Sequence, residues 1–136
     1  MKKDTLRSDC PINYALEHLG DKWTLLVIRD LVFDKKQFYK EFLSSKEGIA
    51  TNILSDRLKR LENLNIIESK VYEKQRTQKI YSLTKKGIDL TPILIELIYW
   101  SAKHQKGLNI SPEFITQLEK DKTGVINTII SSIEKN

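Results

Sequence analysis

The segment "ATNILSDRLKRLENLNIIES", residues Ala50–Ser69, combines two structural patterns and so largely determines the architecture we expect. Leu54, Leu58 and Leu61 recur at helical spacing and form one apolar stripe. The opposite face is polar, with several short hydrogen-bonding side chains among Asn52, Ser55, Asp56, Lys59 and Asn63. We therefore predict a helix that packs by its apolar stripe and uses its polar face to contact a partner.

Directly after this helix the apolar pattern becomes strand-like. Two runs, Ile67–Tyr72 and Gln78–Leu83, alternate in polarity and flank the polar tip "EKQRT". A helix that follows another at a steep angle and precedes a β-hairpin is typical of a winged helix-turn-helix. The fold class we predict is mainly α with a small β-hairpin: a winged helix-turn-helix with flanking dimerisation helices.

Three helices are expected before this segment. In the first, "DCPINYALEHLG", Pro11 suits the helix start and Gly20 the helix end. Asp21 can cap the second helix, "KWTLLVIRDLVF", whose dense apolar residues predict near-complete burial. The third helix, "KQFYKEFLSS", leads into a turn centred on Gly48.

After the hairpin, Thr84 is expected to cap the helix "KKGIDLTPILIELIYWSAKHQ", in which Pro92 either bends the helix or restricts its start. Ser111 and Pro112 mark a new helix start, and the tail reads as one broken helix or two short ones. We accordingly divide the chain into a winged-helix domain, residues 8–104, and a helical C-terminal extension, residues 105–136.

The polar face suits the major groove of DNA, which admits one helix and whose base edges require short donors and acceptors with Arg or Lys. Asp56 could accept a hydrogen bond from cytosine or merely pair with Arg60. Other basic residues are expected to reach phosphates, to brace the helix, or to enter the minor groove from the hairpin tip. The candidate DNA-binding residues are Thr51, Asn52, Ser55, Asp56, Arg57, Lys59, Arg60, Lys74, Arg76 and Lys79.

The distribution of charge agrees with a polyanionic partner. Residues 46–86 contain ten basic and five acidic side chains, whereas the remainder of the chain contains 13 of each. A solvated basic face is the alternative. No apolar run approaches the ~18 residues that span a bilayer, and the charged N-terminus lacks a secretory apolar region. We therefore expect a cytoplasmic protein.

The single cysteine, Cys10, excludes an intramolecular disulfide framework. It stands at a predicted helix start, where the helix dipole favours a thiolate, but it could equally be a small packing residue. His18 and His104 are too isolated for a metal site, and no cofactor is expected. Four aromatic residues could line a ligand pocket between subunits, although core packing is the simpler interpretation: Tyr14, Trp23, Tyr99 and Trp100.

Taken together, these motifs resemble the HxlR-type bacterial transcriptional regulators, a group of MarR-like winged helices. The resemblance covers about residues 8–104 and rests on "CP", "LGDKWTLLVIRDL", Phe38, "GIATNILSDRLKRLENLNII", "YSLTKKG" and "LIELIYWSAKH". The hairpin tip lacks the prolines that such wings often carry, and the tail beyond Gly107 is longer than the usual end.

This resemblance implies a homodimer that binds a palindromic operator and acts more often as a repressor. It also implies that an N-terminal cysteine such as Cys10 senses oxidants or electrophiles. Its dimer interface would use the first helix and the helix after the hairpin, where the apolar stripe exceeds what a small winged helix can cover. The predicted interface residues are Tyr14, Ile93, Leu94, Leu97, Ile98 and Trp100.

Two other functions remain as alternatives. The chain could be a winged-helix module for protein–protein contact that no longer binds DNA, which its basic helix and wing disfavour. An enzyme with Cys10 as nucleophile is disfavoured because no His–Asp arrangement or glycine-rich oxyanion loop accompanies it.

Overall fold

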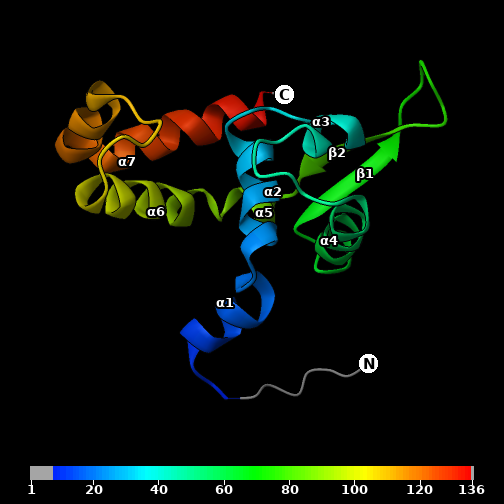
Figure 1. The fold of residues 1–136 in the computed structure, drawn as a ribbon, viewed down its shortest axis with the longest axis horizontal. Coiled ribbons are helices and arrows are strands. Elements are labelled where there is room, and N and C mark those ends of the chain that lie inside the picture. Colours follow the sequence, from blue (N-terminus) through cyan, green and yellow to red (C-terminus); the bar gives the residue numbers. More distant parts are fainter. Residues whose placement is uncertain (1–7, 136) are drawn as a thin grey trace.

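The computed structural model describes residues 8–135, which form seven helices and one hairpin within that range. Figure 1 shows the central helix α2 between the hairpin end of the molecule and the pair α6–α7. The elements in chain order are α1 (Pro11–Leu19), α2 (Lys22–Val32), α3 (Tyr39–Leu43), α4 (Thr51–Asn63), β1 (Ile67–Val71), β2 (Lys79–Leu83), α5 (Lys85–Ile88), α6 (Thr91–His104) and α7 (Pro112–Glu134).

Helix α2 forms the centre of the core. Its buried apolar side chains pack with the leucine stripe of α4, with Phe42 of α3 and with Ile66 and Ile67 at the base of the hairpin. Leu54, the deepest residue of the stripe, is fully buried. Burial of such side chains contributes about 1.5–3 kcal/mol each, so the stripe alone anchors α4. The near-complete burial predicted for α2 holds for one face only, since Lys22 is exposed and Trp23 is half-buried.

A tight turn connects α3 to α4. Gly48 adopts φ +72°, a left-handed conformation that side chains rarely adopt, and its amide donates to the carbonyl of Ser45. This turn therefore joins the two helices of the expected helix-turn-helix. Asn65 follows the C-cap of α4 and has φ 62°, a left-handed conformation that is common directly after the last turn of a helix.

The hairpin is a two-stranded antiparallel sheet in which Ile67 pairs with Leu83 and Val71 with Lys79. Both strands lie within one residue of the predicted runs. The amide of Tyr81 donates to the carbonyl of Gln37 at 2.9 Å, so the segment before α3 is attached to the edge of β2. This attachment fixes the root of the wing to the helix-turn-helix.

The helix predicted after the hairpin is interrupted. Thr84 caps α5 by accepting from the amide of Gly87, but α5 ends at Ile88 and α6 begins at Thr91. Pro92 lies in the first turn of α6, where its missing N–H costs nothing. The alternative in which Pro92 restricts the start of a helix is therefore the correct one.

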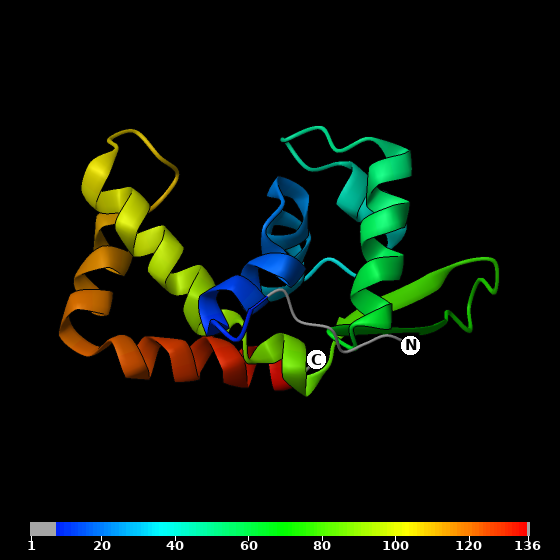
Figure 2. The same ribbon diagram turned by 90° about the horizontal axis from the view of Figure 1, so that it is seen from below.

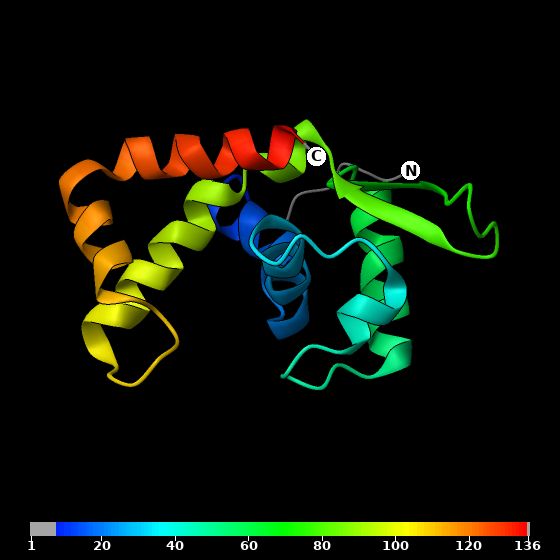
Figure 3. The same ribbon diagram turned by 90° about the horizontal axis from the view of Figure 1, so that it is seen from above.

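The C-terminal helix α7 is broken in the middle, in agreement with the expectation for the tail. Asp121 has non-helical backbone angles (φ −156°, ψ 74°), and its side chain accepts from the amide of Gly124, which restarts the helix. Leu118 before the break is 2% exposed, and Ile129 and Ile133 after it pack against the core. Figures 2 and 3 show that α7 turns back across the molecule to the root of the hairpin.

Candidate DNA-binding surface

The outward face of α4 carries the residues proposed to read bases. Thr51, Asn52, Ser55, Asp56 and Lys59 are all exposed, while the leucine stripe on the other side is buried. The first turn of α4 has no side-chain cap at Ala50, so its backbone N–H groups remain available to an anion. The helix therefore presents a free amino end and one continuous polar face.

Tyr39, at the start of α3, fixes this face, and sequence analysis did not identify it. Its hydroxyl donates to the carbonyl of Thr51 at 3.1 Å and lies 3.0 Å from the hydroxyl of Ser55. The same hydroxyl therefore ties α3 to the first turn and a half of α4. Ser55 is exposed but already has a hydrogen-bond partner, whereas the side chain of Asn52 has none among residues 8–135.

Arg57 and Arg60 brace the helix, which was one of the two roles considered for them. Arg57 Nε donates to Asp21 at 2.8 Å, and Arg60 donates to the carbonyl of Glu17 at 3.0 Å. Asp56 contacts the neighbouring Arg57 rather than Arg60, contrary to the i, i+4 pairing considered above. The two arginines thus join α4 to the junction between α1 and α2 instead of pointing toward a ligand.

Asp21 is the acceptor at that junction. One of its carboxylate oxygens caps α2 by accepting from the amides of Trp23 and Thr24, and the same oxygen receives Arg57. Burial by itself would raise the pKa of Asp21, but hydrogen bonds from Arg57 and Thr24 outweigh it and lower the pKa to about 2. The charged form of Asp21 is therefore strongly favoured in the folded protein.

The hairpin carries the remaining basic residues. Lys74 and Arg76 lie in the tip between the strands, and Lys79 begins β2. Arg76 pairs with Glu73 at 2.7 Å, but both side chains are largely exposed, and such a pair is worth little. Lys74 and Lys79 have no ion-pair partner in the described part of the chain. Figures 2 and 3 place α4 and the hairpin together at one end of the molecule.

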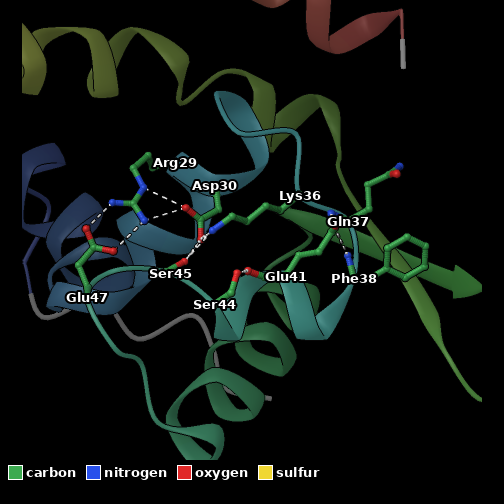
Figure 4. A network of polar contacts seen from close by, with 9 residues as sticks. All are labelled: Arg29, Asp30, Lys36, Gln37, Phe38, Glu41, Ser44, Ser45 and Glu47. Carbon is green, nitrogen blue, oxygen red and sulfur yellow. Dashed lines mark hydrogen bonds and ion pairs between the residues drawn. The ribbon is translucent and has the colours of Figure 1, made fainter. Parts of the chain in front are cut away.

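A second polar cluster, centred on the buried Asp30, holds the turn that precedes α4 (Figure 4). Asp30 accepts from Arg29, from the hydroxyl of Ser45 at 2.6 Å and from Lys36 at 3.4 Å. Arg29 also binds Glu47 through two hydrogen bonds of 2.7 and 3.0 Å. We call this set the Asp30 cluster; sequence analysis missed it because its members are separated along the chain.

The Arg29–Glu47 pair has a clear electrostatic signature. The hydrogen bond from Arg29 lowers the pKa of Glu47 to about 2, and the two carboxylates around Arg29 raise the pKa of its guanidinium. Glu47 directly precedes Gly48 and the start of α4. The pair therefore connects the last turns of α2 to the entry of the exposed helix.

The proposed dimer interface is divided between exposed and buried residues. Tyr14, Ile93, Leu97 and Trp100 are 40–64% exposed, whereas Leu94 is 5% exposed and belongs to the core of the subunit. Ile98 is half-buried and lines a cavity beside α2. Helix α1 has no buried residue and projects from the body of the molecule, with Ile12 and Leu16 also exposed.

Other sequence interpretations can be compared with the fold. Trp23 packs against the core as expected, but Tyr14 and Trp100 are exposed, so the core interpretation is wrong for those two. Tyr99 donates to Glu119 of α7, and the four aromatic residues do not converge on one pocket. Among residues 8–135 no group of side chains could hold a metal ion, and no helix there is long and apolar enough to cross a membrane.

Comparison with protein families assigns this architecture. The family model described as HxlR-like helix-turn-helix matches residues 18–108. The chain belongs to the HxlR-like helix-turn-helix family. Its relatives are transcriptional regulators rather than enzymes. It is 36% identical over 97 residues to the HTH-type transcriptional regulator BH0655 of Halalkalibacterium halodurans, covering 71% of this chain and 86% of that protein.

Two further comparisons, one of sequence and one of structure, relate this HxlR-like chain to named regulators. It is 34% identical to the HTH-type transcriptional regulator YodB of Bacillus subtilis over 93 residues, 68% of this chain and 82% of that protein. The structure of the redox regulator HypR in its oxidized form superposes with a TM-score of 0.62 and 29% identity, covering 72% of this chain and 100% of that chain. The winged-helix fold is thereby confirmed.

We predict that Asp21 contributes to stability beyond its role as a helix cap. Asp21→Ser keeps an oxygen that can cap α2 but loses the ion pairs of Asp21 with Arg57 at 2.8 Å and with Arg60 at 3.6 Å, so the free energy of unfolding should fall by roughly 1–3 kcal/mol. Urea unfolding followed by circular dichroism measures this loss. Ser111→Ala, which removes the cap of α7 alone, is the control and should cost about 1 kcal/mol. An unchanged unfolding free energy in Asp21→Ser would refute the bracing role.

We also predict acid sensitivity from Asp21 and Glu47. The pKa values of these two carboxyl groups in the folded protein, about 2, lie below their ordinary values of 3.8 and 4.5. Each carboxylate therefore stabilises the folded state fully when the pH is above its ordinary pKa, and this stabilisation is lost as the pH falls toward 2. The melting temperature should therefore drop between pH 5 and pH 3 less in Asp21→Asn/Glu47→Gln than in the wild type. Glu113→Gln, an exposed carboxyl on α7, should leave the drop unchanged.

Proposed function

We propose that this HxlR-like regulator is a cytoplasmic homodimer that binds a palindromic DNA operator and acts as a repressor. The observation that carries the proposal is the exposed polar face of α4, which Tyr39, Arg57 and Arg60 hold in place. Beside it lies a hairpin whose Lys74 and Lys79 form no ion pair with any other described residue. A helix of this kind fits the major groove, and the hairpin fits the adjacent backbone or minor groove.

The residues divide into three roles on the DNA. Within residues 8–135, the side chains of Asn52 and Lys59 on the exposed face have no partner, which makes these two residues the strongest candidates for base contacts. Thr51, Ser55 and Asp56 flank them. The DNA phosphates would be neutralised by the hairpin residues Lys74, Arg76 and Lys79. A further phosphate would accept hydrogen bonds from the backbone N–H groups at the uncapped start of α4. Arg57 and Arg60 hold the helix in place and are positioning residues.

The dimer is supported by apolar surface that the subunit leaves exposed. Ile93, Leu97 and Trp100 form one face of α6, and α1 adds Ile12 and Tyr14. These residues are far more exposed than large apolar side chains usually are, which is typical of an interface. A two-fold dimer would place two copies of α4 about one helical turn of DNA apart, ~34–36 Å.

Thiol chemistry at Cys10 is the proposed signal input. Cys10 is exposed and occupies the N-cap position of α1, the helix that adds Ile12 and Tyr14 to the proposed dimer face. The structural relative HypR is described as a redox regulator, and YodB has been solved with a bound quinone. An oxidant would join the Cys10 thiols of two subunits as a disulfide, or an electrophile would add to one thiolate, and either product would alter the packing of α1.

DNA binding is tested by fluorescence anisotropy on the duplex upstream of the protein's own gene and on a shuffled duplex. Asn52→Ala should weaken binding to the native duplex by about 1–3 kcal/mol per half-site and reduce the preference over the shuffled duplex. Lys74→Ala should weaken both equally. If about ten phosphates are neutralised, the logarithmic salt slope is about −9, and removing one contact per subunit should lower it by about 2.

Lys120→Ala provides the matched control for these variants. Lys120 is an exposed lysine of α7 just before the break at Asp121. That first part of α7 lies at the end of the molecule away from α4 and the hairpin (Figure 2), so the loss of Lys120 changes the net charge without touching either. Equal effects of Lys120→Ala and Lys74→Ala would indicate only a general attraction to DNA. If the wild type bound neither duplex, the protein–protein interaction module would replace the DNA-binding proposal.

The dimer face predicts a specific effect on the oligomeric state. Trp100→Glu places a charge in the centre of the exposed face of α6, and at micromolar concentration it should convert the dimer to a monomer in sedimentation velocity. Val71→Glu makes the same kind of change at an exposed position of the hairpin and should leave the dimer intact. A monomeric wild type would contradict the proposed dimer.

The thiol response is tested with diamide, which takes two hydrogens from a pair of thiols as the disulfide forms. We expect diamide to release the wild type from DNA and to produce a covalent dimer on a non-reducing gel. Cys10→Ser should bind DNA normally and resist diamide. Equal release of wild type and Cys10→Ser would eliminate Cys10 as the sensor.

A further inference from the structure

An open-sided cavity of about 570 Å³ lies between α2, α6, the connection that follows α6 and the first turn of α7. This volume is in the range of small-molecule sites in proteins. Only part of its wall comes from the domain that matches the family model, which ends at residue 108. Ile110, Ser111 and Phe114 complete the wall from beyond that limit, so the cavity depends on the C-terminal extension.

The wall is largely apolar, with a few polar groups at separate points. Its apolar side chains include Leu25, Phe33, Leu94, Ala102, Ile110 and Phe114. Ser101 and Asn109 add neutral hydrogen-bonding groups, and neither side chain has a hydrogen-bond partner among residues 8–135. A ligand would therefore bind with an apolar body and a limited number of polar contacts.

Two charged residues, Arg29 and Asp34, also line the cavity, and they differ in whether they are already paired with other charged side chains. The Arg29 guanidinium is held by Asp30 and Glu47, and Lys36, which lies 3.4 Å from Asp30, balances the second of these two carboxylates. Asp34 is exposed and forms no ion pair or hydrogen bond within the described chain. The adjacent Lys35 forms no ion pair with it within the described residues, and its ammonium instead donates to the Ser132 hydroxyl at 2.9 Å. Among the described residues, Asp34 is thus the charged side chain of the cavity wall that has no ion-pair partner.

We propose that this cavity binds a small apolar molecule that carries one positive charge, such as a hydrophobic amine or quaternary ammonium compound. Asp34 would hold the cation at the rim, and Phe33 and Phe114 would contact the apolar body and favour a cation near their rings. An anionic ligand is disfavoured because the Arg29 guanidinium is already paired with Asp30 and Glu47, and because Asp34 on the cavity wall would repel it.

The cavity is connected to α4 through Arg29. This side chain forms part of the cavity wall and at the same time binds Glu47 with two hydrogen bonds. Glu47 precedes the Gly48 turn that positions the start of α4 (Figure 4). A ligand that displaced Arg29 would therefore shift the entry of α4, and this regulatory consequence rests on the proposed DNA-binding function.

Binding is tested without DNA by two-dimensional ¹H–¹⁵N NMR of the full chain. The probes are 4-phenylbutylamine, 4-phenylbutan-1-ol and 4-phenylbutyrate, which share one apolar body and differ in charge. We expect all amide shifts on ligand addition to concentrate at residues 25–34, 94–102 and 108–114, with the amine binding about fivefold more tightly than the alcohol and the acid most weakly. Absence of shifts in these segments for every probe would overturn the proposal.

Asp34→Asn separates charge recognition from simple apolar binding. It should make the amine and the alcohol bind equally, while Glu113→Gln, a nearby carboxyl outside the cavity wall, should keep the fivefold preference. Ala102→Phe should fill the cavity and abolish binding of both probes, with the unperturbed remainder of the spectrum showing that it is folded. An amine preference that survived Asp34→Asn would refute the cationic ligand class.

The connection to α4 has its own readout. The amine should shift the amides of residues 46–50 in the wild type, but not in Glu47→Gln, where the bidentate pair with Arg29 is weakened. Anisotropy with the native duplex then measures whether the amine changes DNA affinity. If the amine shifted the amides of the cavity residues but not those of residues 46–50, the connection between the cavity and α4 would be overturned. If the protein bound the amine but no DNA, only the proposed DNA-binding function would be overturned.

Discussion

The carboxylate of Asp21 serves two helices at once, and the position of the exposed helix depends on it. It caps α2 through two backbone amides and receives Arg57 from α4 at 2.8 Å. Asp21 is half-buried at this junction, and the hydrogen bonds that it accepts outweigh the effect of burial and favour its charged form, which the lowered pKa of about 2 reflects. The apolar stripe holds α4 against the core, and this ionic contact defines its orientation.

The Asp30 cluster complements that contact at the other end of the helix-turn-helix. Asp30 is 2% exposed, and its partners come from α2, from the segment before α3 and from the turn before α4. Buried charges of this kind are costly unless all of their hydrogen bonds are satisfied. The cluster therefore allows few arrangements of the turn, which makes the entry of α4 both well defined and sensitive to Arg29.

The C-terminal extension is integrated with the domain that it follows. Lys122 pairs with Glu96 at 2.7 Å, and Tyr99 donates to Glu119, so α7 is joined to α6 by polar contacts as well as by Leu118. Its last turns reach Lys35 and the core beside the hairpin root. One helix beyond the family match thus touches the proposed dimer helix, the cavity and the winged helix.

The sequence by itself determined the helices and strands, because helix caps, prolines and apolar periodicity act locally. The caps Asp21, Thr84 and Ser111 were each predictable from the sequence. The leucine stripe identified which face of α4 is buried. It also identified the exposed polar face. Only the tertiary structure decided which charged residues remain free. Arg57 and Glu47 find their partners 36 and 18 residues away, and Leu94 is buried rather than exposed. Such contacts depend on how the helices pack, which no local pattern encodes.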